Sequence, residues 1–322
     1  RSELIEANVG IRHYAEWKAD PKYHVDHYVG DRGREWIENG RPEGRPWFCW
    51  VSFPGPHSPI DCGNFPQADL YDPAKIDMPE TDFEMLEQKP PHNSLRGGPE
   101  RQQPLSNDEI RKLRHAYYAN VTLIDEKVGA IVQALKDSGE YDNTLIFFTS
   151  DHGDGHGAHH WNQKTALWEE EIRIPMIVSE PGQTGGRVEE RLVSNGLDLL
   201  PTVCDYAGAD CPDGLDGLSL RPLVRGEDPA WRDEVVVETQ INFGEGPGGP
   251  SYARALVTNR YKYSVYVMGR NREQLVDVVN DPGEMTNLAV EARHQGTLES
   301  CRDRLRAWGE RTEDPGVRIV PA

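Results

Sequence analysis

The sequence predicts an α/β fold with a mainly parallel sheet, helices on both faces, and a smaller C-terminal antiparallel α+β subdomain. Two observations predict it. Up to about residue 232, apolar runs of strand length alternate with segments of helical period. From about residue 233, four short strand-like runs precede a single closing helix. We therefore expect two domains, residues 1–232 and 233–322.

The composition indicates a folded core and disfavours two classes of partner. Of the 322 residues, 37% are hydrophobic and 8 are tryptophan, which argues against disorder. With 35 basic and 54 acidic side chains the net charge is -19, so the surface as a whole disfavours nucleic acid and anionic membranes. No run approaches the ~18 apolar residues of a membrane span.

Cysteine usage predicts neither a disulfide framework nor a zinc ribbon. There are 5 cysteines, an odd number, and no Cys-x-x-Cys spacing. We expect buried free thiols. A pairing of Cys204 with Cys211 across a turn is the alternative.

The first part of the chain predicts a helix, a strand and a long loop. The helix runs from about His24 to Asn39 and ends at Gly40. Its expected apolar face is Val25, Tyr28, Val29, Trp36 and Ile37. Residues 47–53 predict a buried strand by their length and aromatic content. Residues 60–104, rich in Pro, Asp and Gln, predict an ordered loop at the edge of the sheet.

A long helix and a second strand follow. The helix starts at about Ser106, has acidic residues in its first turn, and continues to about Gly139. Its expected inward seam is Tyr117, Val121, Ile124, Val128, Ile131 and Leu135. The apolar run Leu145–Phe148 then predicts a buried central strand.

The remaining elements are shorter. Before residue 210 the sequence predicts a helical turn, a strand and a helix with Asp198 as its N-cap, at Thr165–Glu171, Ile174–Ser179 and about Asp198–Gly208. In the second domain it predicts four strands and a closing helix, at Val235–Glu238, Ala253–Thr258, Lys262–Val267, Gln274–Val278 and Leu298–Trp308. The Gly-rich residues 243–250 predict a flexible connection, with a lid as the alternative.

Ligand-type side chains concentrate in the loop that follows the strand at residues 145–148. Between Asp151 and Lys164 there are 2 carboxylates, 4 histidines and 3 glycines. Ligands bind where the strands of an α/β sheet end, so this loop is the candidate functional site. The alternative is a Gly-rich surface loop in which the histidines have no function.

Four sequence blocks occur in order along the chain. They are PWFCWVSF with PHSP at residues 46–59, DNT through SDHG at 142–153, K…EE…R.P…PG at 164–182, and RYKY…NDPGE..NL at 260–288. Together they resemble the sulfatase family of the alkaline phosphatase superfamily, and they extend along most of the chain. The resemblance implies a metal-dependent sulfuric ester hydrolase, with this chain as its C-terminal part.

The resemblance also implies roles for individual residues. Asp151 and His152 match positions that bind a divalent cation, usually Ca²⁺, although the imidazole leaves Mn²⁺ or another divalent cation open. Lys164 matches the lysine that contacts the sulfate group, and His57 matches the histidine beside the leaving oxygen. Both are therefore expected to be catalytic and substrate-binding residues. His159 is expected as a further substrate contact.

The nucleophile of the family does not appear in this sequence. Sulfatases act through a formylglycine made from the Cys or Ser of a C/S-x-P-x-R motif, and a close match, Ser179–Gln183, has no Arg. The paired metal-binding aspartates and the lysine-histidine pair of the family are also absent. We therefore expect the formylglycine in an N-terminal segment that this sequence lacks or that a separate chain carries.

Two other functions remain open at this point. The same superfamily includes phosphate and phosphonate ester hydrolases, and a noncatalytic sulfatase-like binding protein is a third interpretation. The 322 residues alone are not expected to catalyse, because Asp151 and His152 cannot supply the ~6–8 oxygens that Ca²⁺ prefers. The expected partner of the complete protein is a sulfated small molecule or glycan.

Overall fold

The structure, a computed structural model, describes residues 5–7, 14–80, 105–183, 185–240, 252–267 and 271–322. These residues fall into two units, and each is described by itself. Unit 1 comprises Arg1–Pro79, Pro104–Leu145 and Ser179–Gln183, and unit 2 comprises Glu80–Gln103, Ile146–Val178 and Thr184–Ala322. The predicted domain boundary at residue 232 stays a prediction. The two units divide the chain differently, since residues 146–178 belong to the same unit as the C-terminal strands.

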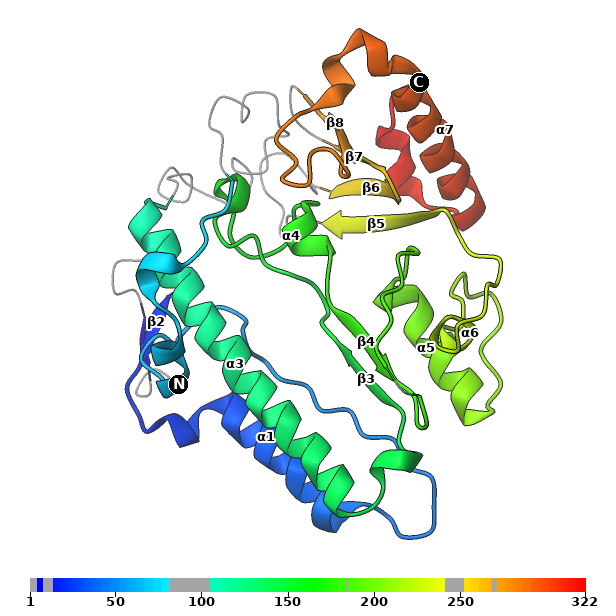
Figure 1. Cartoon of the computed structure of the whole chain (residues 1–322). Helices are drawn as coiled ribbons and strands as arrows, with labels where there is room; N and C mark the ends of the chain where they lie inside the picture. The colour runs from blue at the N-terminus through cyan, green and yellow to red at the C-terminus, as the bar shows by residue number, and fades with distance from the viewer. Residues whose placement is uncertain (1–4, 8–13, 81–104, 184, 241–251, 268–270) are drawn as a thin grey trace. The chain divides into compact units, whose positions relative to one another are not determined.

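Two helices lie side by side in unit 1 (Figure 1). They are α1 (Val25–Glu35), which continues as a π-helical turn at Trp36–Gly40, and α3 (Asn107–Asp137). Ser106 starts α3 through a capping box, in which its backbone N–H donates to Glu109 Oε2 at 2.8 Å. Two short strands, β1 (Ile5–Ala7) and β2 (Ala15–Trp17), pair antiparallel. Both predicted helices of this unit are confirmed.

The face of α1 that packs inward is not the predicted apolar one. Its buried residues follow the helical period but are Asp26, Gly30, Gly33 and Ile37, whereas Tyr28 is 64% exposed. The glycines explain the difference, because they let α3 come close. A Cβ on Gly30 would lie 2.5 Å from the Cβ of Lys127 in α3. Of the predicted face, only Ile37 is buried.

The predicted buried strand at residues 47–53 is wrong. The side chains of the segment alternate between half-buried and exposed, but the segment belongs to none of the sheets that the described residues form. On one side the Trp47 ring meets Trp36 edge to face at 5.4 Å between centroids. On the other, Phe48 and Trp50 are 67% and 68% exposed. A strand is buried on both faces only when other elements cover both, and here only the side facing α1 is covered.

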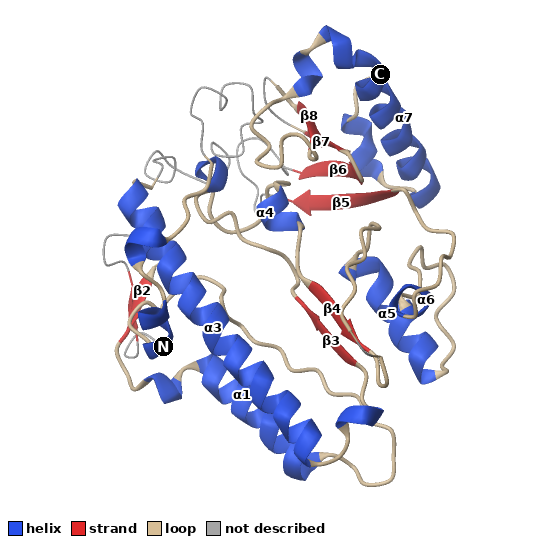
Figure 2. Cartoon of the chain, viewed as in Figure 1, coloured by secondary structure: helices blue, strands red, loops and turns tan. Residues whose placement is uncertain are grey.

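Unit 2 contains the C-terminal antiparallel sheet (Figure 2). Its strands follow chain order: β5 (Glu234–Gln240), β6 (Tyr252–Thr258), β7 (Tyr261–Tyr266) and β8 (Glu273–Asp277). Helix α7 (Gln295–Thr312) closes the chain. The four predicted strands and the closing helix are confirmed.

Both faces of this sheet are covered. On one face Tyr263 and Leu275 pack with Leu298 and Leu305 of α7. On the other face Leu167, from the segment before α4 (Glu169–Ile172), packs against Ala253, Ala255 and Tyr266. The sheet therefore supports the segment that follows the candidate functional loop.

The other elements of this part of the chain are short. The strands β3 (Ile146–Thr149) and β4 (Met176–Ser179) pair with each other. Both strands were predicted. The full burial predicted for β3 is wrong, because Phe148 is 36% exposed, and in β4 Ile177 is 59% exposed. Among the described strands, the pairings of β1–β2 and of β5 to β8 are antiparallel, and the mainly parallel sheet stays a prediction.

Helices α5 (Asn195–Ala207) and α6 (Arg221–Val224) complete the structure. The predicted N-cap of α5 is wrong, since the helix begins earlier and Asp198 lies within it. Asp198 is fully buried because its carboxylate accepts two hydrogen bonds from Arg232, both at 2.6 Å. Gly208, at φ 63°, ends the helix as predicted.

All five cysteines are free thiols, so Cys204 and Cys211 do not pair. Only Cys62 and Cys301 are buried. Among the described residues, no helix is both long enough and apolar enough to cross a membrane. The predicted loop at residues 243–250 and residues 81–104 of the predicted loop 60–104 lie outside the described residues.

Candidate functional site

The loop that follows β3 is held by hydrogen bonds within the loop and by one from α5. The side chain of Asn195 in α5 donates to the carbonyl of Ser150 at 2.8 Å. The Ser150 hydroxyl donates to the carbonyl of His152 at 2.8 Å, and the backbone N–H of His152 donates to Asp151 Oδ1 at 2.9 Å. These bonds hold the loop while leaving the Asp151 side chain 83% exposed.

Gly153 stands where no other residue fits. Its N–H donates to the carbonyl of Glu171 at 2.8 Å. A Cβ at this position would lie 2.0 Å from the carbonyl oxygen of Glu170, far inside van der Waals contact. The glycine of the SDHG block therefore lets the loop lie directly against α4.

Asp151, His152 and Lys164 come together at the end of β3. The Lys164 ammonium donates to His152 Nε2 at 2.9 Å. Asp151 Oδ2 lies 3.5 Å from the same ring nitrogen. A carboxylate and an ammonium group thus lie within hydrogen-bonding or ion-pairing distance of one imidazole ring nitrogen.

The donor atoms of this cluster fit a divalent cation. His152 Nδ1 donates to the carbonyl of Gly153 at 2.7 Å, which leaves the lone pair of Nε2 to act as acceptor or ligand. Metal–ligand bonds of about 2.1 to 2.4 Å at a right angle separate two donors by about 3.2 Å. The observed 3.5 Å between Asp151 Oδ2 and His152 Nε2 is close to this value. Lys164 uses the same lone pair, so it has to turn aside when a cation binds.

His159 lies deeper than the sequence predicted. It is 3% exposed, and its ring stacks on Trp168 at 3.9 Å between centroids. Its Nε2 lies 3.8 Å from Glu170 Oε2. The predicted substrate contact stays a prediction, and a ligand would have to reach a side chain that is almost fully buried.

A buried ion-pair network beneath the loop was not predicted. Lys262 of β7, 1% exposed, lies 2.6 Å from Glu284 Oε1 and 3.0 Å from Glu169 Oε1. Glu284 also accepts from the backbone N–H of Glu169 at 2.7 Å. The three residues belong to two of the quoted blocks, Glu169 to residues 164–182 and both Lys262 and Glu284 to residues 260–288. Their contact brings these two blocks together in the structure.

The protonation equilibria of this network reflect its burial. Burial lowers the pKa of Lys262, but the neighbouring carboxylates of Glu284 and Glu169 outweigh it and raise the pKa overall. Burial raises the pKa of Glu284 to about 6, and Lys262 offsets only part of that effect. Lys262 therefore remains an ammonium and anchors the start of α4 to the C-terminal sheet.

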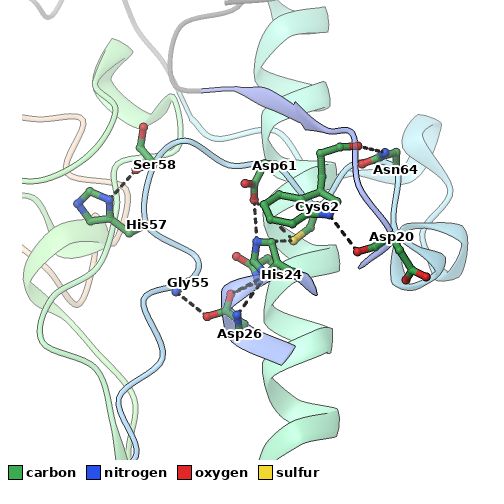
Figure 3. A network of polar contacts seen from close by, with 11 residues as sticks. Asp20, His24, Asp26, Gly55, His57, Ser58, Asp61, Cys62 and Asn64 are labelled. Carbon is green, nitrogen blue, oxygen red and sulfur yellow. Dashed lines mark hydrogen bonds and ion pairs between the residues drawn. The ribbon is translucent and has the colours of Figure 1, made fainter. Parts of the chain in front are cut away.

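His57 belongs to unit 1, where a compact turn holds it (Figure 3). Its Nδ1 bonds the carbonyl of Ser58 at 2.7 Å, and the ring is exposed. The buried carboxylate of Asp26 accepts from the backbone N–H of Gly55 at 3.0 Å and from Asn120 Nδ2 at 2.9 Å. Helix α1 thereby fixes the turn from which His57 projects.

Family models match two overlapping parts of the chain. The model described as Sulfatase matches residues 2–209, more than half of the sequence. The model described as N-sulphoglucosamine sulphohydrolase, C-terminal, matches residues 157–311. The two together cover the loop after β3 and the C-terminal sheet.

Curated relatives and solved structures agree with these matches. The chain is 32% identical to a choline-sulfatase of Rhizobium meliloti, over 87% of this chain and 54% of the relative. It is 28% identical to an arylsulfatase of Clostridium perfringens, over 89% of this chain and 58% of the relative. The chain thus spans little more than half the length of these relatives.

Among solved structures, a 2-O GAG sulfatase is similar with a TM-score of 0.75 and 27% identity, over 92% of this chain and 66% of that chain. A phosphonate monoester hydrolase from Silicibacter pomeroyi is similar with a TM-score of 0.80 and 25% identity, over 94% of this chain and 63% of that chain. These neighbours bear out an α/β fold for the chain.

Proposed function

The chain belongs to the sulfatase family, and on that premise we propose that it forms the C-terminal part of a sulfuric ester hydrolase that uses a divalent cation and a formylglycine. The observation that carries the proposal is the cluster of Asp151, His152 and Lys164, joined by distances of 2.9 and 3.5 Å at the end of β3. A carboxylate, an imidazole and an ammonium group suit the binding of a cation together with an anionic ester.

Each residue of the cluster has its own task in this proposal. Asp151 and His152 hold the cation, which is Ca²⁺ if the carboxylate dominates and Mn²⁺ or another divalent cation if the imidazole does. When bound, such a cation offsets charge on an oxygen of the sulfate group. Lys164, a compact charge, binds a second sulfate oxygen and stabilises the negative charge that develops there.

His57 is proposed to protonate the departing alcohol. Its Nδ1–H is held by the carbonyl of Ser58, so Nε2 is the atom that exchanges a proton with the substrate. The contacts of Asp26 and Gly55 keep the turn in place. His159 is proposed as a substrate contact that needs a local opening of its loop, given its 3% exposure.

The nucleophile is proposed to lie outside the 322 residues. The sequence holds no C/S-x-P-x-R motif, and Ser179–Gln183 lacks its Arg. A formylglycine on a further segment, in the same polypeptide or on a separate chain, supplies the group that attacks sulfur. The further oxygen ligands of the cation are proposed to come from the same segment.

The proposed substrate is a sulfated small molecule or glycan. Two relatives point to this class by their names, the choline-sulfatase and a Delta 4,5-hexuronate-2-O-sulfatase of Bacteroides thetaiotaomicron. Both names contain a sulfate group, and they differ in the molecule that carries it. The sulfate-binding residues named above are therefore the part of the proposal that this chain itself supports.

Replacing Lys164 tests the proposal. In the full-length protein, Lys164→Ala is expected to lower kcat/KM for an aryl sulfate by about 10²- to 10³-fold, because one donor to the developing charge is lost. Lys75→Ala is the matched control, since the Lys75 side chain is 83% exposed. Circular dichroism checks that both variants fold. An unchanged kcat/KM in folded Lys164→Ala would remove Lys164 from the site.

A phosphate or phosphonate ester hydrolase is the second candidate. The similarity to a phosphonate monoester hydrolase, with a TM-score of 0.80, favours it specifically. Turnover of aryl sulfate, aryl phosphate and a phosphonate monoester by the full-length protein separates the two. Faster cleavage of either phosphorus ester would replace our assignment. A noncatalytic binding protein is the third, and it would follow from a full-length sequence without C/S-x-P-x-R.

A further inference from the structure

A second group of metal-ligand side chains lies in unit 1, at the start of α1 (Figure 3). His24 Nε2 lies 3.1 Å from Asp61 Oδ1 and 4.0 Å from Cys62 Sγ. Cys62 Sγ lies 3.9 Å from the same Asp61 oxygen. The exposures of His24, Asp61 and Cys62 are 3%, 5% and 0%. An imidazole, a carboxylate and a thiol thus converge from two distant parts of the sequence inside the core.

The spacing of these atoms resembles one face of a tetrahedral zinc site. Zn–N and Zn–O bonds of about 2.0 Å and a Zn–S bond of about 2.3 Å separate the ligand atoms by about 3.3 Å for N···O and about 3.5 Å for the pairs with sulfur. The observed distances are 3.1, 4.0 and 3.9 Å. Each differs from the tetrahedral value by about half an ångström or less. Small side-chain rotations are enough to reach it.

The charge of the cluster favours a cation. Asp26, 0% exposed, adds a second carboxylate, with Oδ2 3.5 Å from His24 Nδ1. In the described part of the chain, Asp26 and Asp61 receive hydrogen bonds from backbone N–H, amide, imidazole and thiol donors. Even a protonated His24 balances only one of the two carboxylates. A buried negative charge without an opposite charge is costly, and a divalent ion removes that cost.

The surroundings also orient His24 as a metal ligand. Nδ1 lies 3.5 Å from Asp26 Oδ2 on one side of the ring, where it also accepts the capping hydrogen bond of the Asp26 backbone N–H at 3.3 Å, a bond that is given up when Nδ1 takes up a proton. Nε2 faces Asp61 and Cys62 on the other side. A histidine that binds a metal through one nitrogen usually donates from the other to a carboxylate. The rings of Trp17 and Phe65 meet His24 edge to face at 4.9 and 5.2 Å and limit its rotation.

We propose that His24, Asp61 and Cys62 bind one Zn²⁺ ion, with Asp26 accepting from Nδ1–H of His24. Mixed N, O and S donors suit zinc and not calcium, which takes oxygen ligands. The thiol proton and the Nε2 proton leave as the metal binds, Nδ1 takes up a proton, and a water molecule completes the tetrahedron. The site is independent of the proposed sulfatase activity and has a structural task, which is to fasten the start of α1 to residues 61 and 62.

The other candidate metal-binding cluster of the described residues does not have an uncompensated negative charge. His159, Glu170 and Glu284 also lie close together, but the Lys262 ammonium lies 2.6 Å from Glu284. A fixed positive charge already occupies the place of a cation there. Of these two clusters of described residues, the one at Cys62 has no lysine or arginine paired with its carboxylates.

Cobalt substitution tests the proposal with a readout that does not involve activity. Co²⁺ added to the full chain is expected to give a near-ultraviolet thiolate-to-cobalt charge-transfer band with one Co²⁺ per chain. The band is expected to vanish in Cys62→Ser and to remain in Cys301→Ser, a matched control because Cys301 is the other buried thiol. Zn²⁺ is expected to displace the band in the wild type. His24→Gln is expected to weaken Zn²⁺ binding at least about tenfold.

The outcomes separate this site from the one at Asp151. Absence of a thiolate band in the wild type would overturn the proposal, and so would a band that persists in Cys62→Ser. If Cys62→Ser does not fold, X-ray absorption at the zinc edge of the wild type decides instead. One sulfur scatterer at about 2.3 Å supports the proposal, and a shell of nitrogen and oxygen alone overturns it.

Discussion

At the scale of single residues, the loop after β3 depends on a close contact between Gly153 and the backbone of α4. The sequence singled out Asp151, His152 and Lys164 because each lies in a quoted block and carries a side chain with evident chemistry, and their roles stay predictions. Gly153 has no side chain, and its task, close approach to α4, became visible only as a distance to the carbonyl of Glu170. The contact between Glu284 and Lys262 was equally hidden, because membership of one sequence block does not say which side chains of the block touch.

Gly153→Ala is expected to destabilise unit 2. Its Cβ would lie 2.0 Å from a backbone oxygen, so the loop and α4 have to separate. We expect a loss of about 1 to 3 kcal/mol in the free energy of unfolding, measured in urea. Gly186→Ala is the control, because nothing lies within 4 Å of a Cβ there. Equal effects of the two substitutions would contradict the close-packing explanation.

At the scale of elements, the sequence predicts well what is decided locally and poorly what is decided by neighbours. The start of α3 follows from the Ser106–Glu109 capping box, and the four C-terminal strands follow from short strand-like runs joined by turns. The segment 47–53 has strand composition, yet pairing requires a neighbour that its own residues do not specify. The inward face of α1 was missed because its contacts are made by glycines, which no hydrophobic pattern reveals.

Two glycines in the packed helices of unit 1 are expected to respond in opposite ways to the same substitution. Gly30→Ala places a Cβ 2.5 Å from the Cβ of Lys127, so α1 and α3 must move apart and stability falls. Gly129→Ala in α3 meets nothing within 4 Å and is expected to stabilise by about 0.5 to 1 kcal/mol through helix propensity. Thermal unfolding measures both. A stabilised Gly30→Ala would refute the close contact of the helices.

At the scale of the whole molecule, many of the acidic side chains form ion pairs with arginines. The net charge is -19, yet several carboxylates of the C-terminal sheet have arginine partners. Glu273 accepts from Arg302 Nε at 2.7 Å and from the Tyr263 hydroxyl at 2.6 Å. Burial raises the pKa of Glu273, but these hydrogen bonds outweigh it and lower the pKa overall.

This pairing sets the sign of a pH effect. The pKa of Glu273 is lower in the folded state than in the unfolded state. Its contribution to the free energy of unfolding is therefore fully present above the unfolded-state pKa of about 4.3 and is lost as the pH falls through the folded-state pKa. Glu273→Gln is therefore expected to lower Tm at pH 7 and to approach the wild type below about pH 4. Glu299→Gln is the control, with a side chain that is 50% exposed. A Tm difference that stays constant down to pH 3 would contradict the pairing.

The exposed aromatic side chains of residues 47–53 also bear on self-association of the chain. Phe48 and Trp50 expose aromatic rings from a segment that belongs to none of the described sheets, and exposed apolar side chains of this kind favour association between molecules. Mutual repulsion between chains of net charge -19 opposes that encounter at low ionic strength. Added salt shortens the range of the repulsion to about 10 Å at 0.1 M and leaves the aromatic attraction intact. Self-association of the isolated chain therefore grows as salt is added.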